Sequence, residues 1–300
     1  MKHPSAVNNF IKWFHRDPAK SNQHCLYCGV FVGADAVVDS DEEHLVGRRF
    51  VPKGSMNKAF NFSFRACRRC NGEKANLERH VSSVTLLGSP SVSVDENARR
   101  SAERKAAGDI HPETGMKMGE AIERQTVEFK FGAATFSFGV SGPSPAAKDS
   151  VPLLASFHIQ ALFSLVTQPG NPAVGEVRLL PLDQFHVFGS YPHADWGNPQ
   201  LVEVTRRVAS WPCRVAIKSG DGHFLACLRR NEGNGWFWAL EWNKSLRIVG
   251  GINLPDETTP LFEDLPMLDW KPLPDGSGRF RMEQGTPDLG AILFPASCQS

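Results

Sequence analysis

The chain has 300 residues, a formal net charge of +1 and 22% charged residues, which is the composition of an ordinary soluble globular protein. Its near-neutral charge excludes a polycation, and no stretch reaches the roughly 18 apolar residues that a membrane span needs. The first residues begin no apolar run typical of a signal peptide, so we expect a cytoplasmic protein. Because 300 residues exceed one typical core, we also expect two domains.

The N-terminal part predicts short elements separated by turns. Residues 8–15 are typical of a short amphipathic helix, and residues 27–38 of a turn that leads into a strand. Phenylalanine alternates with polar residues over 60–65, which predicts a strand. A helix should then run from about residue 68 toward residue 81.

Beyond residue 88 the pattern changes twice. Residues 95–107 are charged and predict a solvent-facing helix with Asp95 as its N-cap. Alternation over 127–140 predicts a hairpin, and an apolar segment over 153–166 predicts a buried helix. Further strands are expected over 177–180, 213–217, 224–229 and 236–242.

Four of the seven cysteines stand in two CxxC pairs, Cys25 with Cys28 and Cys67 with Cys70. Zinc prefers four tetrahedral ligands and thiolates suit it, so the pairs predict a structural zinc ion without an open coordination position. His24, next to Cys25, is an alternative ligand. The segment between the pairs is longer than the roughly 15 to 20 residues of a simple zinc ribbon, so it should hold structure of its own. An odd number of cysteines argues against a disulfide framework, and we expect reduced thiols.

Basic residues gather in one part of this neutral chain. Residues 45–79 contain nine lysines and arginines but only Glu73 and Glu78 as acidic residues. A local basic surface suits a polyanionic partner, and the alternative is a solvated face that binds nothing.

The order of these motifs resembles the zinc-stabilised HNH endonucleases, which are also called the ββα-metal or His-Me finger family. The resemblance covers about residues 22–82. It implies an HNH nuclease domain of the ββα-metal type over 1–90. The patterns described above, and not the resemblance, predict a charged helical connector over 91–124 and a β-rich α+β domain over 125–300, and so an α+β protein overall. The matching residues are Cys25, Cys28, Glu43, His44, Pro52, Asn61, Cys67, Cys70, Asn71 and Lys74.

The resemblance also implies the chemistry of phosphodiester hydrolysis. His44 would be the general base, since an imidazole with an ordinary pKa near 6.5 can take a proton from water at cellular pH. Glu43 and Asn71 would hold one Mg²⁺ or Mn²⁺ on the scissile phosphate. Asp41 and Glu42 are alternative metal ligands.

The middle asparagine of the family pattern would orient His44 or brace its loop. Asn61 is the expected residue, and Asn57 is the alternative. DNA is expected as the substrate rather than RNA, on the resemblance alone. Side chains that would bind its backbone are Arg48, Arg49, Arg68, Arg69 and Lys74.

The C-terminal part contains no motif that indicates a chemistry. Residues 236–242 are rich in tryptophan, which indicates a sheet core or, alternatively, a stacking platform for bases. The expected role of residues 125–300 is target recognition, or control of the nuclease by a protein or small molecule. Small HNH proteins with appended domains often serve in restriction or phage defence, so the resemblance also implies such a role. The rival interpretation of the whole chain is a non-catalytic zinc-knuckle module that binds nucleic acid.

Overall fold

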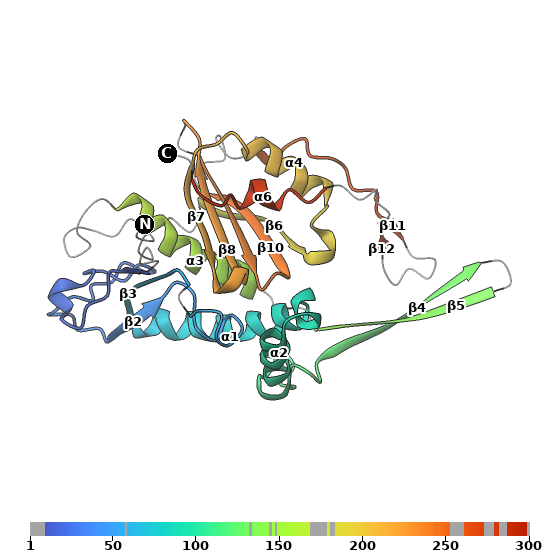
Figure 1. Cartoon of the computed structure of the whole chain (residues 1–300), viewed down its shortest axis with the longest axis horizontal. Coiled ribbons are helices and arrows are strands. Elements are labelled where there is room, and N and C mark those ends of the chain that lie inside the picture. Colours follow the sequence, from blue (N-terminus) through green and yellow to red (C-terminus); the bar gives the residue numbers. More distant parts are fainter. Residues whose placement is uncertain are drawn as a thin grey trace, which may run out of the picture.

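The computed structural model shows a mixed α+β fold (Figure 1). It describes residues 10–57, 59–131, 134–143, 146–147, 149–168, 179–180, 184–233, 235–252, 261–272, 279–281 and 287–298. The N-terminal elements are β1 (Phe10–Lys12), η1 (Pro18–Lys20), β2 (Ser40–His44), β3 (Asn61–Cys67), α1 (Arg68–Leu87), η2 (Pro90–Ser93) and α2 (Glu96–Gly108).

The N-terminal sheet has the order β1-β3-β2, with β2 antiparallel and β1 parallel to the central strand β3. Every residue of β3 is buried, including Phe62 and Phe64, which confirms the strand predicted from the alternating phenylalanines. The helix expected over 8–15 is wrong for its described part, because residues 10–12 form β1. So short a helix is marginal in water, and pairing with the open edge of β3 satisfies the backbone instead.

The segment 27–38 also differs from its prediction, since it holds turns and only a single bridge between His24 and Phe31. Helix α1 confirms the prediction that a helix begins near residue 68, and α2 packs against it. Asp95 caps α2 as expected, because its side chain accepts hydrogen bonds from the backbone N–H groups of Asn97 (2.8 Å) and Ala98 (3.2 Å).

The predicted hairpin is confirmed and is longer than expected. Strands β4 (Ile122–Phe131) and β5 (Ala134–Pro143) pair antiparallel and project from the body of the protein (Figure 1).

The C-terminal half is built on a five-stranded antiparallel sheet with the order β6-β10-β9-β8-β7. Helix α3 covers one face of this sheet, and α4 and α6 cover the other (Figure 1). The elements are α3 (Ser150–Thr167), β6 (Phe185–Pro192), η4 (His193–Asp195), α4 (Pro199–Val208), β7 (Cys213–Ser219), η5 (Gly220–Gly222), β8 (Phe224–Arg230), β9 (Trp236–Trp242), β10 (Leu246–Ile252), β11 (Lys271–Pro272), β12 (Arg279–Phe280) and α6 (Gly290–Leu293). Most of the strand predicted over 177–180 lies outside the described residues.

The aromatic strand β9 belongs to the core. Trp238 and Trp242 are fully buried on the α3 side, and Phe237 is buried on the opposite side. The prediction of a sheet core is therefore confirmed, and the alternative of a stacking platform is wrong because the indole rings are not presented to solvent.

The N-terminal and C-terminal halves share one hydrophobic core. The Phe50 ring, in the loop after β2, lies 5.7 Å from the Trp242 ring and 5.6 Å from the His158 ring of α3. Asn243, in the β9–β10 turn, donates hydrogen bonds to the carbonyl of Phe50 (3.1 Å) and to Thr85 Oγ1 of α1 (2.9 Å). The halves are thus joined by apolar and polar contacts.

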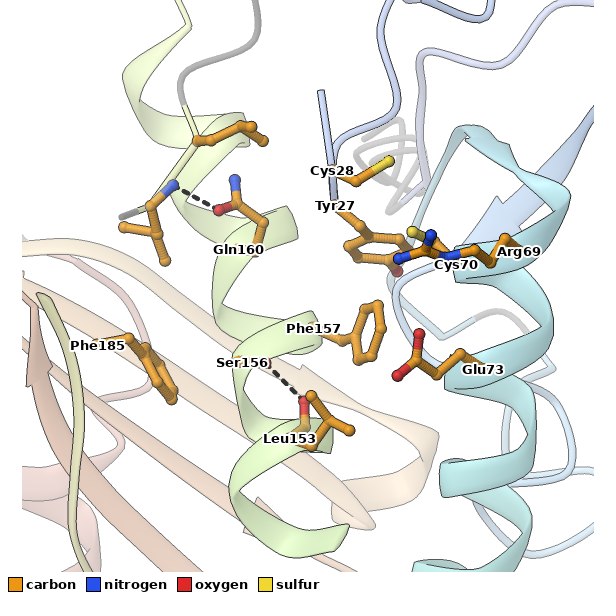
Figure 2. A pocket seen from close by; sticks show the side chains of 12 residues that line it. Tyr27, Cys28, Arg69, Cys70, Glu73, Leu153, Ser156, Phe157, Gln160 and Phe185 are labelled. Atoms are coloured by element: carbon orange, nitrogen blue, oxygen red, sulfur yellow. Dashed lines mark hydrogen bonds between the residues drawn. The ribbon is translucent and has the colours of Figure 1, made fainter. Parts of the chain in front are cut away.

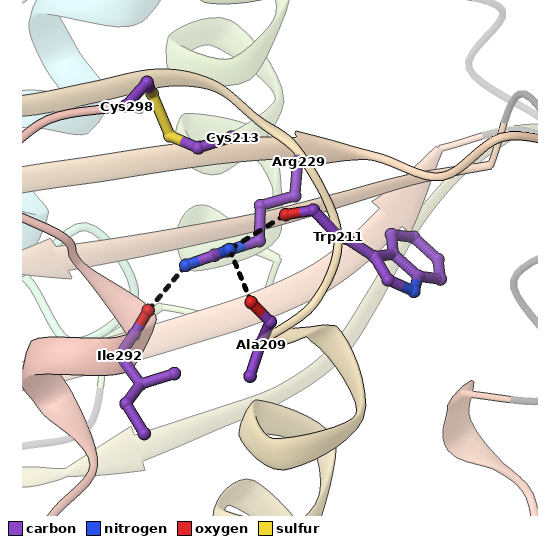
Figure 3. Close-up of a disulfide and its surroundings, with 6 residues drawn as sticks. All are labelled: Ala209, Trp211, Cys213, Arg229, Ile292 and Cys298. Carbon is purple, nitrogen blue, oxygen red and sulfur yellow. Dashed lines mark hydrogen bonds between the residues drawn. A yellow bond between two sulfur atoms is a disulfide. The ribbon is translucent and has the colours of Figure 1, made fainter. Parts of the chain in front are cut away.

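A disulfide joins Cys213 of β7 to Cys298, although we expected only reduced thiols (Figure 3). Next to it, the buried Arg229 side chain donates hydrogen bonds to the carbonyls of Trp211 (3.0 Å) and Ile292 (2.7 Å). These bonds hold the C-terminal segment against the sheet. The free cysteines in the described part of the chain are Cys25, Cys28, Cys67, Cys70 and Cys227.

Among the helices that the structure describes, α3 alone is long and apolar enough to cross a membrane, and 61% of it is buried inside the fold.

Candidate functional site

The four cysteines of the CxxC pairs come together into one cluster. Their sulfur atoms lie within 4.8 Å of one another, and Cys28 Sγ is 3.7 Å from Cys67 Sγ. Tetrahedral zinc with bonds of about 2.3 Å separates its sulfur ligands by about 3.8 Å, so the cluster fits a Zn²⁺ ion. No other group of three or more histidine, cysteine or acidic side chains gathers in this way within the described ranges.

The cluster joins elements that are far apart in sequence. Cys25 and Cys28 lie on a turn, Cys67 ends β3 and Cys70 lies in the first turn of α1. The thiol of Cys70 lowers the pKa of Cys25 to about 5 through a hydrogen bond, so Cys25 is prepared to act as a thiolate ligand. His24 lies outside the cluster, with its ring 5.6 Å from the Phe31 ring.

A pocket of about 400 Å³ separates the start of α1 from α3 beside this cluster (Figure 2). Tyr27 and Phe157 meet edge to face in it, with ring centroids 4.7 Å apart. Arg69 and Glu73 line the same pocket, on the side of α1 that faces α3 (Figure 2). Arg69 was expected to bind nucleic acid, but it does not line the His44 pocket described next.

His44 and Asn71 are brought together in a second pocket of about 290 Å³. His44 ends β2 and Asn71 lies in the first turn of α1, so the β2–β3 hairpin and the helix start place the two side chains. The Nε2 atom of His44 lies 4.0 Å from Glu42 Oε1. The lining residues of this His44 pocket are Glu42, Glu43, His44, Gly47, Arg48, Arg49, Asn71, Ala75, Glu78 and Arg79.

The environment of His44 favours the neutral imidazole. Burial lowers its pKa below the ordinary value, although the carboxylate of Glu42 acts in the opposite direction. Its side chain keeps 27% of its surface exposed. A half-buried, neutral and accessible imidazole can accept a proton from water at neutral pH.

Asn61 braces the loop that follows His44. Its Oδ1 accepts a hydrogen bond from Val46 N (3.2 Å), and its Nδ2 donates to Val46 O (3.0 Å). Asn57, the alternative for this position, lies exposed in a turn, where its backbone N–H donates to Gly54 O. Of the two asparagines, Asn61 alone is placed to fix the backbone next to the histidine.

Glu43 and Lys74 form a buried charge network beneath the pocket. Lys74 Nζ lies 2.7 Å from Glu43 Oε1 and 2.7 Å from Glu78 Oε1, and it donates to the His44 carbonyl (3.0 Å). Glu78 Oε1 also accepts from Gly47 N (3.0 Å). Glu43, expected as a metal ligand, therefore has its carboxylate engaged by Lys74, and Lys74, expected to bind nucleic acid, is fully buried.

The network reaches into the C-terminal half through α3. His158 Nε2 lies 3.4 Å from Glu78 Oε1, and its ring is fully buried. Burial lowers the pKa of His158 to about 4. For Lys74, burial lowers the pKa, but the carboxylates of Glu43 and Glu78 outweigh this effect and raise it, so the ammonium stays charged.

The other predicted basic residues separate into two groups. Arg48 and Arg49 line the His44 pocket, whereas Arg68 pairs with Asp39 (2.9 Å) and Asp41 (3.3 Å) at the opposite end of the β2–β3 hairpin. This pairing also occupies Asp41, so Glu42 is the acidic alternative that remains beside His44.

Sequence reasoning missed Arg79 as a site residue. Asn71, Ala75 and Arg79 recur at helical spacing along α1 and line the same pocket. This periodicity was a usable signal, because a predicted helix with Asn71 in the pocket places Arg79 on the same face.

No protein-family model, curated protein or solved structure matches this chain.

Proposed function

We propose that the protein is a metal-dependent endonuclease of the HNH type that hydrolyses phosphodiester bonds, with a structural zinc ion in its cysteine cluster. One observation carries this proposal: His44 and Asn71, from separate elements, line one accessible pocket whose rim holds Arg48, Arg49 and Arg79. Hydrolysis of a phosphodiester needs a base for the attacking water and positive charge around the phosphate, and this pocket offers both.

His44 is the general base in this proposal. Its neutral imidazole accepts the proton of the attacking water, and the Val46 backbone held by Asn61 limits the movement of the strand end. The three arginines bind the non-bridging oxygens of the phosphate, which holds the scissile bond against the imidazole.

Glu42 and Asn71 are the residues that would hold Mg²⁺ or Mn²⁺, because both offer oxygen atoms at the His44 pocket. When bound, such an ion supplies positive charge that stabilises the leaving oxygen. Glu42 replaces Glu43 in this role because the carboxylate of Glu43 is bound to a buried ammonium, which also holds the His44 carbonyl.

The test is plasmid cleavage with Mg²⁺ or Mn²⁺ by the full chain and by a His44→Ala variant. We expect the variant to lose cleavage by at least 100-fold, since general base catalysis contributes roughly 10²- to 10⁴-fold. Its zinc content and melting temperature should not change, because the imidazole lies in the wall of the pocket with 27% of its side-chain surface exposed. DNA and RNA substrates assayed side by side identify the preferred nucleic acid.

Unchanged cleavage in His44→Ala would remove His44 as the base. A matched control is His186→Ala, which changes an exposed histidine of β6 and should leave cleavage intact.

The second candidate is a non-catalytic zinc-stabilised module that binds nucleic acid. It is favoured by the pairing of Glu43 with Lys74, because the carboxylate that the resemblance assigns to the metal is already bound to an ammonium. Glu42 is then the carboxylate that lies beside His44. This candidate predicts binding without cleavage in the unaltered protein. For the C-terminal half we propose recognition or control of the site, since α3 contacts Glu78 directly beneath it.

A further inference from the structure

The His44 pocket continues into a groove between α1 and α2. Arg48, Arg49 and Arg79 line both the His44 pocket and a neighbouring hollow of about 420 Å³. Lys53 and Arg104 line that hollow and also a third one at the outer end of α2. Because adjacent hollows share lining residues, the three lie side by side in a row, which we call the α1–α2 groove.

The groove collects basic side chains, and several of them have no acidic partner among the described residues. The side chains of Arg48, Arg49, Lys53 and Arg79 are exposed and form no ion pair with any residue that the structure describes. Lys105 pairs with Asp109 at 3.3 Å, and this aspartate is the acidic residue of the middle hollow.

Arg99 shows the contrast on the same helix. It pairs with Glu96 (2.7 Å) and Glu103 (2.7 Å) and lines none of the three hollows. Arg100 lines the outer hollow but pairs with Glu96 (2.6 Å). Arg104 lines two of the hollows, forms no ion pair with any residue that the structure describes, and donates hydrogen bonds to the Arg100 carbonyl and to Ser101 Oγ. Like charges that are left unpaired at close range repel one another, so this arrangement is stabilised by an anion that spans them.

The length of the groove suits several phosphates rather than one. Asn71 and Arg79 are separated by about 12 Å along α1, at about 1.5 Å per residue. Phosphates of one strand of duplex DNA follow one another every 3.4 Å along the axis, so this distance spans about three or four of them. Lys53 and Arg104 extend the basic surface beyond Arg79.

We infer that the α1–α2 groove is a binding track for the sugar-phosphate backbone of a nucleic acid strand, and that it leads this strand across the His44 pocket. Charged side chains contact phosphates without reading bases, so binding should be independent of sequence and sensitive to salt. Helix α2, expected from the sequence to be a connector, is then one wall of the binding site. The delivery of a phosphate to His44 rests on the proposed function, whereas the binding itself does not.

The test measures binding of a 20-base-pair DNA duplex by fluorescence anisotropy between 50 and 200 mM salt, in the zinc-loaded His44→Ala background, so that cleavage cannot interfere. The variant is Lys53→Ala with Arg104→Ala, which changes two exposed side chains. We expect at least a tenfold loss of affinity. The slope of log K against log salt should fall by about 1.8, at about 0.9 per phosphate contact.

The matched control is Arg99→Ala, whose affinity and salt slope should stay within twofold of the parent protein. Equal affinity and slope in the double variant and the parent would overturn the track. Tighter binding of the parent protein to anionic lipid vesicles than to nucleic acid would also overturn it. Single-stranded DNA and RNA are assayed in parallel, and a preference for either supports the track, because the backbone chemistry is shared.

Failure of the track and failure of the nuclease are distinguishable. Groove-dependent binding, together with no cleavage by the protein that keeps His44, supports the track and removes the proposed activity. For the cleavage assay, Lys53→Ala and Arg104→Ala are introduced with His44 intact, and undiminished cleavage by this variant supports the activity and removes the track.

Discussion

The N-terminal unit and the C-terminal sheet are stabilised in different ways. The C-terminal sheet has apolar cores on both faces and a disulfide, with Trp238 and Trp242 fully buried. The N-terminal unit has three short strands, a cysteine cluster fit for zinc and buried charges around Lys74. The difference teaches that the candidate site lies next to a cluster that fits a metal ion and above paired buried charges, whereas the C-terminal sheet is held by apolar packing.

The largest effect should come from the metal cluster. A Cys67→Ser change removes one zinc ligand, and zinc binding supplies about 10 kcal/mol or more of folding free energy in small zinc units. We expect loss of bound zinc and rapid proteolysis within residues 10–90. Metal analysis and limited proteolysis measure both outcomes.

Cys227→Ala is the control. Cys227 is a buried free cysteine of β8, and it does not belong to the cluster of Cys25, Cys28, Cys67 and Cys70. This variant should retain zinc. A Cys67→Ser protein that melts normally without zinc would show that the N-terminal unit does not depend on the metal.

The next effect should come from the buried charges. Lys74→Met removes the ammonium and leaves the carboxylates of Glu43 and Glu78 buried without their cation. Removing one partner of a buried ion pair costs about 3 to 5 kcal/mol, and we expect a loss of this size in the free energy of unfolding by urea. The control Lys53→Met changes an exposed lysine and should alter the free energy of unfolding by about 0.5 kcal/mol or less. A loss under about 1 kcal/mol at Lys74 would show that the network is not a main source of stability.

A smaller effect should appear at the seam between the two regions when the pH falls. Burial lowers the pKa of His158 to about 4, while the unfolded chain titrates near 6.5. Between these values the unfolded state binds more protons, so the stability is fully present above about pH 6.5 and declines toward pH 4. At about 1.4 kcal/mol per pKa unit, His158 contributes on the order of 3 kcal/mol to this decline.

His158→Gln should therefore flatten the dependence of the unfolding free energy on pH in this window, whereas His186→Gln should leave it unchanged. Glu78, with its pKa lowered to about 2, acts at a lower pH, since its contribution is lost between about pH 4.5 and 2. If the unfolding free energy of His158→Gln had the same slope against pH as that of the parent protein, protonation of His158 would not be the cause of the decline.

Much of the local structure could be predicted from the sequence. The CxxC spacing anticipated the cysteine cluster, the alternating phenylalanines anticipated β3, and Asp95 anticipated the start of α2. His44 and Asn71 could be named as a pair because a strand end and a helix start flank the same zinc unit. These signals are local, since they depend on side-chain spacing, capping and periodicity within one element.

The choice between neighbouring acidic residues could not be made in this way. Glu42 and Glu43 alternate across β2, so one of them faces His44 while the other faces Lys74. Which side of the strand is buried depends on what packs there, and the tertiary structure places α1 and Lys74 under Glu43.

The sequence by itself determined β3, the starts of α1 and α2, the four cysteines of a cluster that fits zinc, and the candidate residues His44 and Asn71. The tertiary structure alone decided that the two halves share a core, that Cys213 pairs with Cys298 and that α2 forms a wall of the basic groove. The physical reason is that spacing governs contacts within an element, whereas burial and charge pairing depend on which distant elements meet.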